Sequence, residues 1–176
     1  MAGRNSQATA GGDDEGMLQL RRSIAASVLA RMKARIPGLS AHFGEDCEQS
    51  DDAEAAVYRS TGASFRWVAF AFSPWRMWDL HVGVVPTDER HLSVGFHVSE
   101  RASPLLLGHL ERLGAELGAP AKHQPAALEY QANLPLIDVR SATPDSLTDT
   151  IAQLCSRYAA VAAAVPCPAE MRDRTA

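Results

Sequence analysis

Lysine is nearly absent from this chain, and so are the sequence motifs of the common enzyme families. Lys33 and Lys122 are its two lysines, and the net charge at pH 7 is −4. A chain of negative net charge lacks the basic footprint with which proteins bind nucleic acid. No glycine-rich phosphate loop, nucleophile elbow, HExxH zinc motif or zinc-deaminase pattern occurs. The sequence therefore indicates no nucleic-acid partner, and it assigns the chain to none of these enzyme classes.

Cysteine is scarce as well, and long apolar runs are missing. The three cysteines are Cys47, Cys155 and Cys167, and none has the CxxC spacing. Such a set argues against a disulfide framework and against a zinc site. No apolar run reaches the ~18 residues of a membrane span, and the first residues lack the basic and apolar regions of a signal peptide. We therefore expect a cytoplasmic protein with no membrane partner.

The length of 176 residues suits a single domain with a substantial core. Residues 1–12 are small and polar, and we expect them to be disordered. The predicted domain spans residues 13–165, and residues 166–176 are expected to form a flexible tail. Residues 39–53 are rich in acids. We expect a solvated loop there, with a divalent-cation site as the less ordinary alternative.

Three segments carry apolar residues at the spacing of three and four that is typical of amphipathic helices. The first follows the acids at residues 13–15 and ends at Pro37 and Gly38. The second begins with Ser103 as the predicted N-cap, and the third begins with Thr143 in that role. The apolar stripes consist of Met17, Leu20, Ile24, Val28, Met32 and Ile36 in the first segment, Leu106, Leu110, Leu113 and Leu117 in the second, and Leu147, Ile151, Leu154, Tyr158, Val161 and Val165 in the third.

Strand patterns occupy much of the chain between these helices. Residues 54–60 form a short candidate strand. Residues 64–73 form a second one, which is apolar on both faces and is therefore expected near the centre of the sheet. Residues 127–133 alternate between apolar and polar, and residues 134–139 could extend that strand past Pro135 as a bulge or edge strand.

The stretch from Trp78 to Val98 is the clearest of these patterns, a β-hairpin with two unlike faces. In its strands the even-numbered residues are apolar and the odd-numbered residues are mostly polar or small, so each set lies on one face of the sheet. Both apolar sets must lie on the same side, which requires an odd number of loop residues. A loop of residues 86–90 or 87–89 fits. We expect His81 to lie diagonal to His97 with the longer loop and directly opposite it with the shorter one, so the two are neighbours on the polar face in either case.

These elements predict an α+β domain in the order α-β-β-β-β-α-β-α. The predicted fold is a two-layer sandwich in which a mostly antiparallel sheet of about five strands carries three amphipathic helices on one face. This order of elements is similar to that of small secretion-chaperone-like α+β domains. That resemblance implies a sheet and terminal helices that form a homodimer and hold a partner chain.

The polar face of the sheet carries the candidate site. His81 and His97 are the strongest pair, and Asp79 or Glu129 supplies a carboxylate. A histidine with a carboxylate can act as a general acid and base near neutral pH. Two imidazoles with a carboxylate can also hold a divalent metal with open positions. The candidate ligand-binding residues are Trp75, Arg76, Trp78, Ser93, Gln131 and Asn133.

Each of these features also has an ordinary structural explanation. The histidines could decorate a solvated sheet face or a dimer interface, since antiparallel sheets commonly keep one face in water. Trp75 and Trp78 are typical anchors of a binding surface, and they could equally close the end of the core. Gly83 and Gly95 leave room in which a ligand could approach the sheet. We interpret the histidines outside the hairpin as incidental: His42, His109 and His123.

Two classes of function follow from these observations. The first is a binding or accessory module that presents the polar sheet face to a protein partner or a small molecule, with the tryptophans at its rim. The second is a small-molecule enzyme that uses His81 and His97 with a carboxylate, as an acid/base pair or a metal site. The absence of a catalytic motif favours the first class. The sequence identifies no cofactor and leaves metal dependence open.

Overall fold

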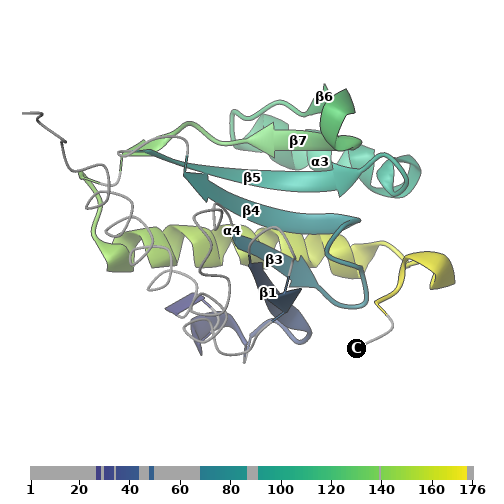
Figure 1. The fold of residues 1–176 in the computed structure, drawn as a ribbon, viewed down its shortest axis with the longest axis horizontal. Helices are drawn as coiled ribbons and strands as arrows, with labels where there is room; N and C mark the ends of the chain where they lie inside the picture. The colour runs from purple at the N-terminus through teal and green to yellow at the C-terminus, as the bar shows by residue number, and fades with distance from the viewer. Residues whose placement is uncertain are drawn as a thin grey trace, which may run out of the picture.

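The computed structural model describes residues 27–28, 30–33, 35–43, 48–49, 68–86, 91–138 and 140–173. Within these residues an antiparallel sheet packs against helices (Figure 1). The chain therefore has the α+β class that its sequence predicts. In this part of the chain no helix combines the length and the apolar character needed to cross a membrane.

The described strands form one sheet with the path β2-β1-β3-β4-β5-β7-β6, and β8 pairs with β5 beside β7. The strands are β1 (Leu39–Phe43), β2 (Glu48–Gln49), β3 (Val68–Phe72), β4 (Leu80–Pro86), β5 (His91–Ser99), β6 (Lys122–Gln124), β7 (Glu129–Asn133) and β8 (Ile137–Asp138). The helices are α3 (Ser103–Glu116) and α4 (Pro144–Ala164), with the short 3₁₀ helices η1 (Pro125–Ala127) and η2 (Ala169–Met171). Residues 27–28 and 30–32 are also helical. The described part of the chain thus has more and shorter strands than the sequence predicts.

The β4–β5 hairpin has the predicted parity, with even-numbered residues paired to even-numbered ones. The ladder runs to Pro86 opposite Leu92 and sets His81 directly opposite His97, which is one of the two expected arrangements. Parity alone could not select this register. It sets the two imidazole rings opposite each other and Gly83 opposite Gly95.

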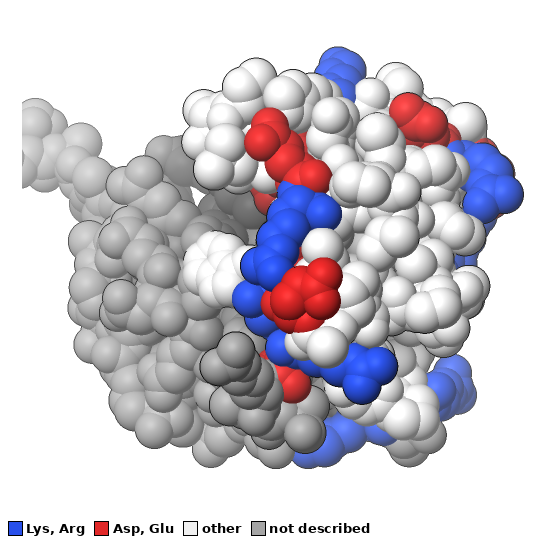
Figure 2. Space-filling view, turned by 90° about the vertical axis from the view of Figure 1, so that its right-hand side faces the viewer, with Lys and Arg blue, Asp and Glu red and all other residues white. Residues whose placement is uncertain are grey.

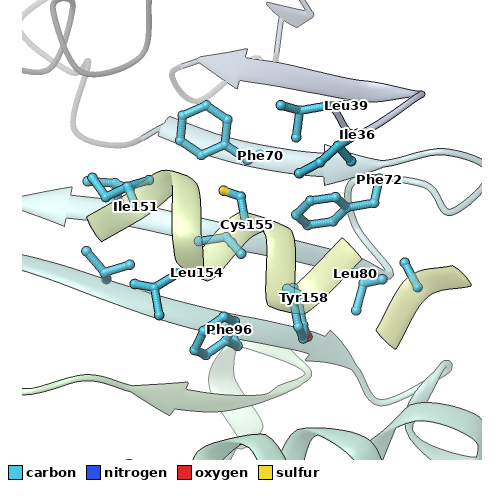
Figure 3. Packing of buried hydrophobic residues seen from close by; sticks show 14 of the residues in the cluster. Ile36, Leu39, Phe70, Phe72, Leu80, Phe96, Ile151, Leu154, Cys155 and Tyr158 are labelled. Carbon is cyan, nitrogen blue, oxygen red and sulfur yellow. The ribbon is translucent and has the colours of Figure 1, made fainter. Parts of the chain in front are cut away.

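The apolar face of the hairpin forms the centre of the core, together with α4. Figure 3 shows Ile151, Leu154 and Tyr158 of α4 pointing at the strands. The ring of Tyr158 lies 4.8 Å from that of Phe96 between centroids, and its hydroxyl donates a hydrogen bond of 2.9 Å to the backbone oxygen of His97. The even-numbered hairpin residues in this core are all buried: Leu80, Val82, Val84, Leu92, Val94, Phe96 and Val98.

Helix α3 packs in the same core, against the strands that follow the hairpin. Its buried residues Leu106, Leu110 and Leu113 join the cluster that contains Ala132 of β7. The predicted N-cap is displaced by one residue. Ala102 occupies the cap position, because the Ser99 hydroxyl accepts the backbone N–H of Ala102 and the helix begins at Ser103.

The N-terminus of α4 is as predicted. The hydroxyl of Thr143 accepts the backbone N–H of Ser146, and the hydroxyl of Ser146 accepts the backbone N–H of Thr143. This reciprocal pair is a capping box, which satisfies two of the backbone donors at the helix start. Asp145 lies in the first turn, where the helix dipole favours an acid.

Two segments of the predicted acidic loop, residues 39–43 and 48–49, are strands. Residues 39–43 lie at the start of the predicted acidic loop, and they form β1 beside β3. Leu39 and Ala41 are buried there, and this apolar alternation outweighs the acids that begin only at Glu45. Residues 122–124 form β6, because β7 offers them a backbone edge with which to pair.

The C-terminal residues pack on the domain up to Asp173, where we expected a flexible tail. Cys167 and Met171 are buried, and Arg172 forms a β-bridge with Trp75. The backbone N–H of Asp173 donates to the oxygen of Pro74 at 2.9 Å. Figure 2 shows this end of the molecule, where lysine and arginine side chains lie next to acidic ones.

Several predictions concern residues that the structure does not describe. The disorder of residues 1–12, the first part of the first helix and the strand at 54–60 all lie outside the described residues. Within the predicted strand at 64–73, residues 68–72 are described. They form β3, are buried throughout and lie between β1 and β4, as expected.

Two glycine substitutions in α3 test how this helix is seated on the sheet. A Cβ at Gly114 would lie 2.3 Å from the oxygen of Ala119, whereas a Cβ at Gly108 would meet no atom within 4 Å. We expect Gly114→Ala to lower the free energy of unfolding by about 1–3 kcal/mol, and Gly108→Ala to raise it by about 0.5–1 kcal/mol through helix propensity. Urea unfolding measures both. A stabilising Gly114→Ala would contradict the close packing described here.

Candidate functional site

Two histidine rings lie stacked on the polar face of the sheet. The ring centroids of His81 and His97 are 4.4 Å apart, and the ring planes are inclined by 25°. The Nδ1 of His81 lies 2.9 Å from the carbonyl oxygen of Met77. A carbonyl oxygen only accepts hydrogen bonds, so this nitrogen carries the proton and the Nε2 of a neutral His81 is an acceptor.

Glu129 of β7 holds the second ring. Its Oε1 accepts a hydrogen bond of 3.0 Å from the Nδ1 of His97 and one of 2.5 Å from the Nε2 of Gln131. The Oε1 of Gln131 in turn accepts the Nδ2 of Asn133 at 3.1 Å. Alternate residues of a strand share a face, and this brings the three β7 side chains into one row. We call the row from Asn133 through Gln131 and Glu129 to His97 the β7 relay.

Burial and hydrogen bonding set the charges in this cluster. Burial, followed by the charge of His97, lowers the pKa of His81 to about 3, so His81 is neutral at neutral pH. Burial alone would raise the pKa of Glu129. The hydrogen bond and charge of His97, with the hydrogen bond of Gln131, outweigh it and bring this pKa below its ordinary value. Glu129 is therefore ionised at neutral pH.

Gly83 and Gly95 are cross-strand partners that lie close to the His97 ring. A Cβ at Gly83 would lie 3.1 Å from the Nε2 of His97. A Cβ at Gly95 would lie 3.0 Å from the same nitrogen and 2.1 Å from the Oδ1 of Asn133. The room that we predicted for a ligand is thus taken up by two side chains of the site. The glycines allow those side chains to lie close to the sheet.

His42 belongs to this face of the sheet, although we interpreted it as incidental. It lies on β1 directly opposite Ala69, and its side chain is buried. Its charge contributes to the lowered pKa of His81. The short alternation of residues 39–43 is the signal that could have identified this strand, and with it the position of His42.

The tryptophans do not form the predicted pair of anchors. Trp75 is 1% exposed and donates its Nε1–H to the oxygen of Ala162 at 3.1 Å. It closes the end of the core, as the alternative interpretation held, and it is not a surface anchor. Trp78 is 62% exposed and remains accessible near the start of β4.

Asp79 and Arg76 also lie apart from the histidines. Asp79 is 3% exposed, and its Oδ2 accepts hydrogen bonds of 2.8 and 2.7 Å from Arg76. Its Oδ1 accepts the hydroxyl of Ser99 at 2.9 Å. This carboxylate therefore fixes the turn before β4, and Glu129 is the acid of the histidine pair. Ser93 lies four residues from His97 along β5, roughly 13 Å away at strand spacing.

The same side chains are the candidate metal ligands among the described residues. His81, His97 and Glu129 each offer one ligand atom, and these atoms lie within 4.8 Å of one another. Both rings are anchored through Nδ1, as metal-ligating histidines usually are. The lone pair of an imidazole nitrogen lies in the ring plane, however, and stacked rings direct their lone pairs side by side. Zinc bound ~2 Å from both nitrogens would require one ring to turn.

No model of a known protein family, no curated protein and no solved structure matches this chain. The site therefore has to be interpreted from its own chemistry. Glu129 pins the Nδ1 proton of His97, and the opposite nitrogen of that ring can accept a proton or a hydrogen bond. The arrangement can bind a polar group, and it can also serve as a carboxylate–imidazole base.

The pH dependence of stability tests the neutral state of His81. Its pKa lies below the ordinary 6.5 in the folded chain, so the folded state binds fewer protons and the free energy of unfolding falls as the pH drops from 6.5 toward 3. Between pH 7 and pH 5 we expect the wild type to lose about 1–2 kcal/mol more than His81→Gln. Urea unfolding over this range measures the difference.

The range between pH 7 and pH 5 separates the effect of His81 on stability from that of Glu129. The ordinary pKa of Glu129 is 4.5, so the stability due to its ionised form is lost mainly below pH 4.5, under the measured range. His109→Gln on α3 serves as the control and should lose stability as the wild type does. Equal losses in the wild type and in His81→Gln would show that His81 is not held neutral by burial.

Proposed function

We propose that this protein is a binding module for a small polar molecule, which contacts the side chains of His81, His97, Glu129, Gln131 and Asn133. We call this set the histidine face. The observation that supports the proposal is that hydrogen bonds within the protein already orient the polar groups of this set. Met77 holds one ring, Glu129 holds the other, and the β7 relay orients both amides. Groups that are oriented before binding lose less entropy when a ligand arrives.

The exposure of these groups favours a small ligand over a protein partner. The side chain of His97 is 12% exposed and that of Glu129 is 16% exposed. A small molecule can reach polar atoms that are recessed in this way, and such sites commonly place a few polar groups to fix its orientation. A protein interface would call for exposed anchors; of the two predicted tryptophan anchors Trp75 is buried, and Trp78 alone is exposed.

The finer features of the predicted architecture support the same proposal. We infer a two-layer arrangement, with the helices on the core face of the sheet and the histidine face on the other side. A cytoplasmic location fits the thiols of Cys155 and Cys167, which are buried and not joined in a disulfide. A homodimer and a protein partner stay predictions from the order of elements.

A small-molecule enzyme is the second candidate, and one observation favours it. The Nδ1 of His97 donates to the Glu129 carboxylate, which fixes the ring and leaves Nε2 as the reacting nitrogen. In that case His97 would take a proton from the substrate, and Glu129 would orient it and stabilise the charged ring. His81 is neutral and stacked on the same ring.

Ligand-observed NMR with a library of small polar metabolites tests the binding proposal. We expect compounds whose signals broaden with the wild type and with Gly108→Ala, but not with His97→Ala. Asn133→Ala should weaken the binding of the same compounds, because it removes one end of the β7 relay. Each compound should compete with the others, since we propose one site.

The same samples distinguish a binding module from an enzyme. A binding module leaves the compounds unchanged over hours, whereas an enzyme converts them at a rate that falls at least about 100-fold in His97→Gln. Binding that persists in His97→Ala would place the ligand elsewhere on the protein, and the proposal would then be wrong.

A further inference from the structure

The carboxylate oxygen of Glu129 sets the direction of every hydrogen bond in the β7 relay. A carboxylate only accepts, so Gln131 must turn its NH₂ group toward Glu129 and its oxygen toward Asn133. Asn133 must then donate its own NH₂ group to that oxygen, which leaves its Oδ1 at the end of the row. In the other direction, His97 donates from Nδ1, which leaves Nε2 without a proton in the neutral ring.

The two ends of this network meet beside Gly95. The Nε2 of His97 and the Oδ1 of Asn133 lie 3.0 and 2.1 Å from the point where a Cβ of residue 95 would stand. Within the described part of the chain neither atom has a hydrogen-bond partner. The site therefore presents two acceptors close together, and the described residues contribute no donor that satisfies both.

We infer that the ligand of the histidine face carries a primary ammonium or amino group, which donates to the Nε2 of His97 and to the Oδ1 of Asn133. This inference rests on the proposed function and names the chemical class of its ligand. A nitrogen with two or more hydrogens can serve both acceptors at ~2.9 Å each. A single hydroxyl has one hydrogen and can serve only one of them.

The charges around the site are consistent with a cationic group. Glu129 is the acidic member of the β7 relay, and its Oε1 lies 3.0 Å from the Nδ1 of His97. Lys122 is directly opposite Gln131 on β6, at the outer edge of the same face. It lies two strands from His97, roughly 10 Å at the spacing of neighbouring strands. The negative charge is therefore the closer of the two to the acceptor pair.

Four simple probes separate the chemistries that could be recognised here. The full chain, labelled with ¹⁵N, is titrated with methylammonium chloride, tetramethylammonium chloride, sodium acetate and zinc chloride, and the shift of the His97 Nε2 signal is followed. Methylammonium should shift this signal in a saturable way. Tetramethylammonium has the charge without N–H donors, and acetate has only acceptors, so neither should shift it at the same concentrations.

Variants of the chain test which residues bind methylammonium. Asn133→Ala should weaken methylammonium binding about tenfold through the loss of one acceptor. Glu129→Gln should weaken it as well, because a neutral amide no longer sets the direction of the relay, and Gly108→Ala should leave it unchanged. Equal shifts with tetramethylammonium, a shift with acetate, saturable binding of zinc alone, or no shift with any probe would each overturn the inference. Metabolites that bind through His97 but carry no amino group would overturn it too, while leaving the proposed function intact.

Discussion

The ionised side chain of Glu129 is the constraint on which the candidate site depends. It is partly buried, and its charge is held by two donors that reach it from β5 and β7. Since a carboxylate accepts and never donates, one charge determines the tautomer of His97 and the orientation of two amides. With a neutral side chain at this position, His97 could adopt either tautomer and each amide group could rotate by 180°. The orientation of the polar groups on this face therefore depends on the charge of one residue, Glu129.

The sheet makes this arrangement possible because it separates the polar groups from the apolar core. The side chains of β4, β5 and β7 alternate, so the histidines and the β7 relay lie on one face while Val82, Phe96 and Ala132 lie on the other. Buried residues of α3 and α4 belong to the same core cluster as these apolar side chains. The small residues of the polar face let the rings and amides lie close to the backbone, where their hydrogen bonds are partly shielded from water.

Much of this face follows from the alternation in the sequence. Parity alone places His81 with His97 on one side and Glu129, Gln131 and Asn133 on the same side, and the structure brings these five together. Alternation is a local property, so it could not determine which residues of two strands lie opposite each other. It also could not reveal the burial of Trp75, whose hydrogen-bond partner Ala162 lies far along the chain. Long-range partners of this kind leave no periodic signal.

The hydrogen bond from the Tyr158 hydroxyl to the backbone oxygen of His97 couples the core side of the sheet to its polar side. Tyr158 belongs to α4 and is fully buried, yet it holds the main chain of a residue whose side chain faces the other way. A shift of α4 would therefore be transmitted through this hydrogen bond to the main chain of His97. Substitutions deep in the core can in this way act as distant modulators of ligand affinity, although none of the altered atoms would touch the ligand.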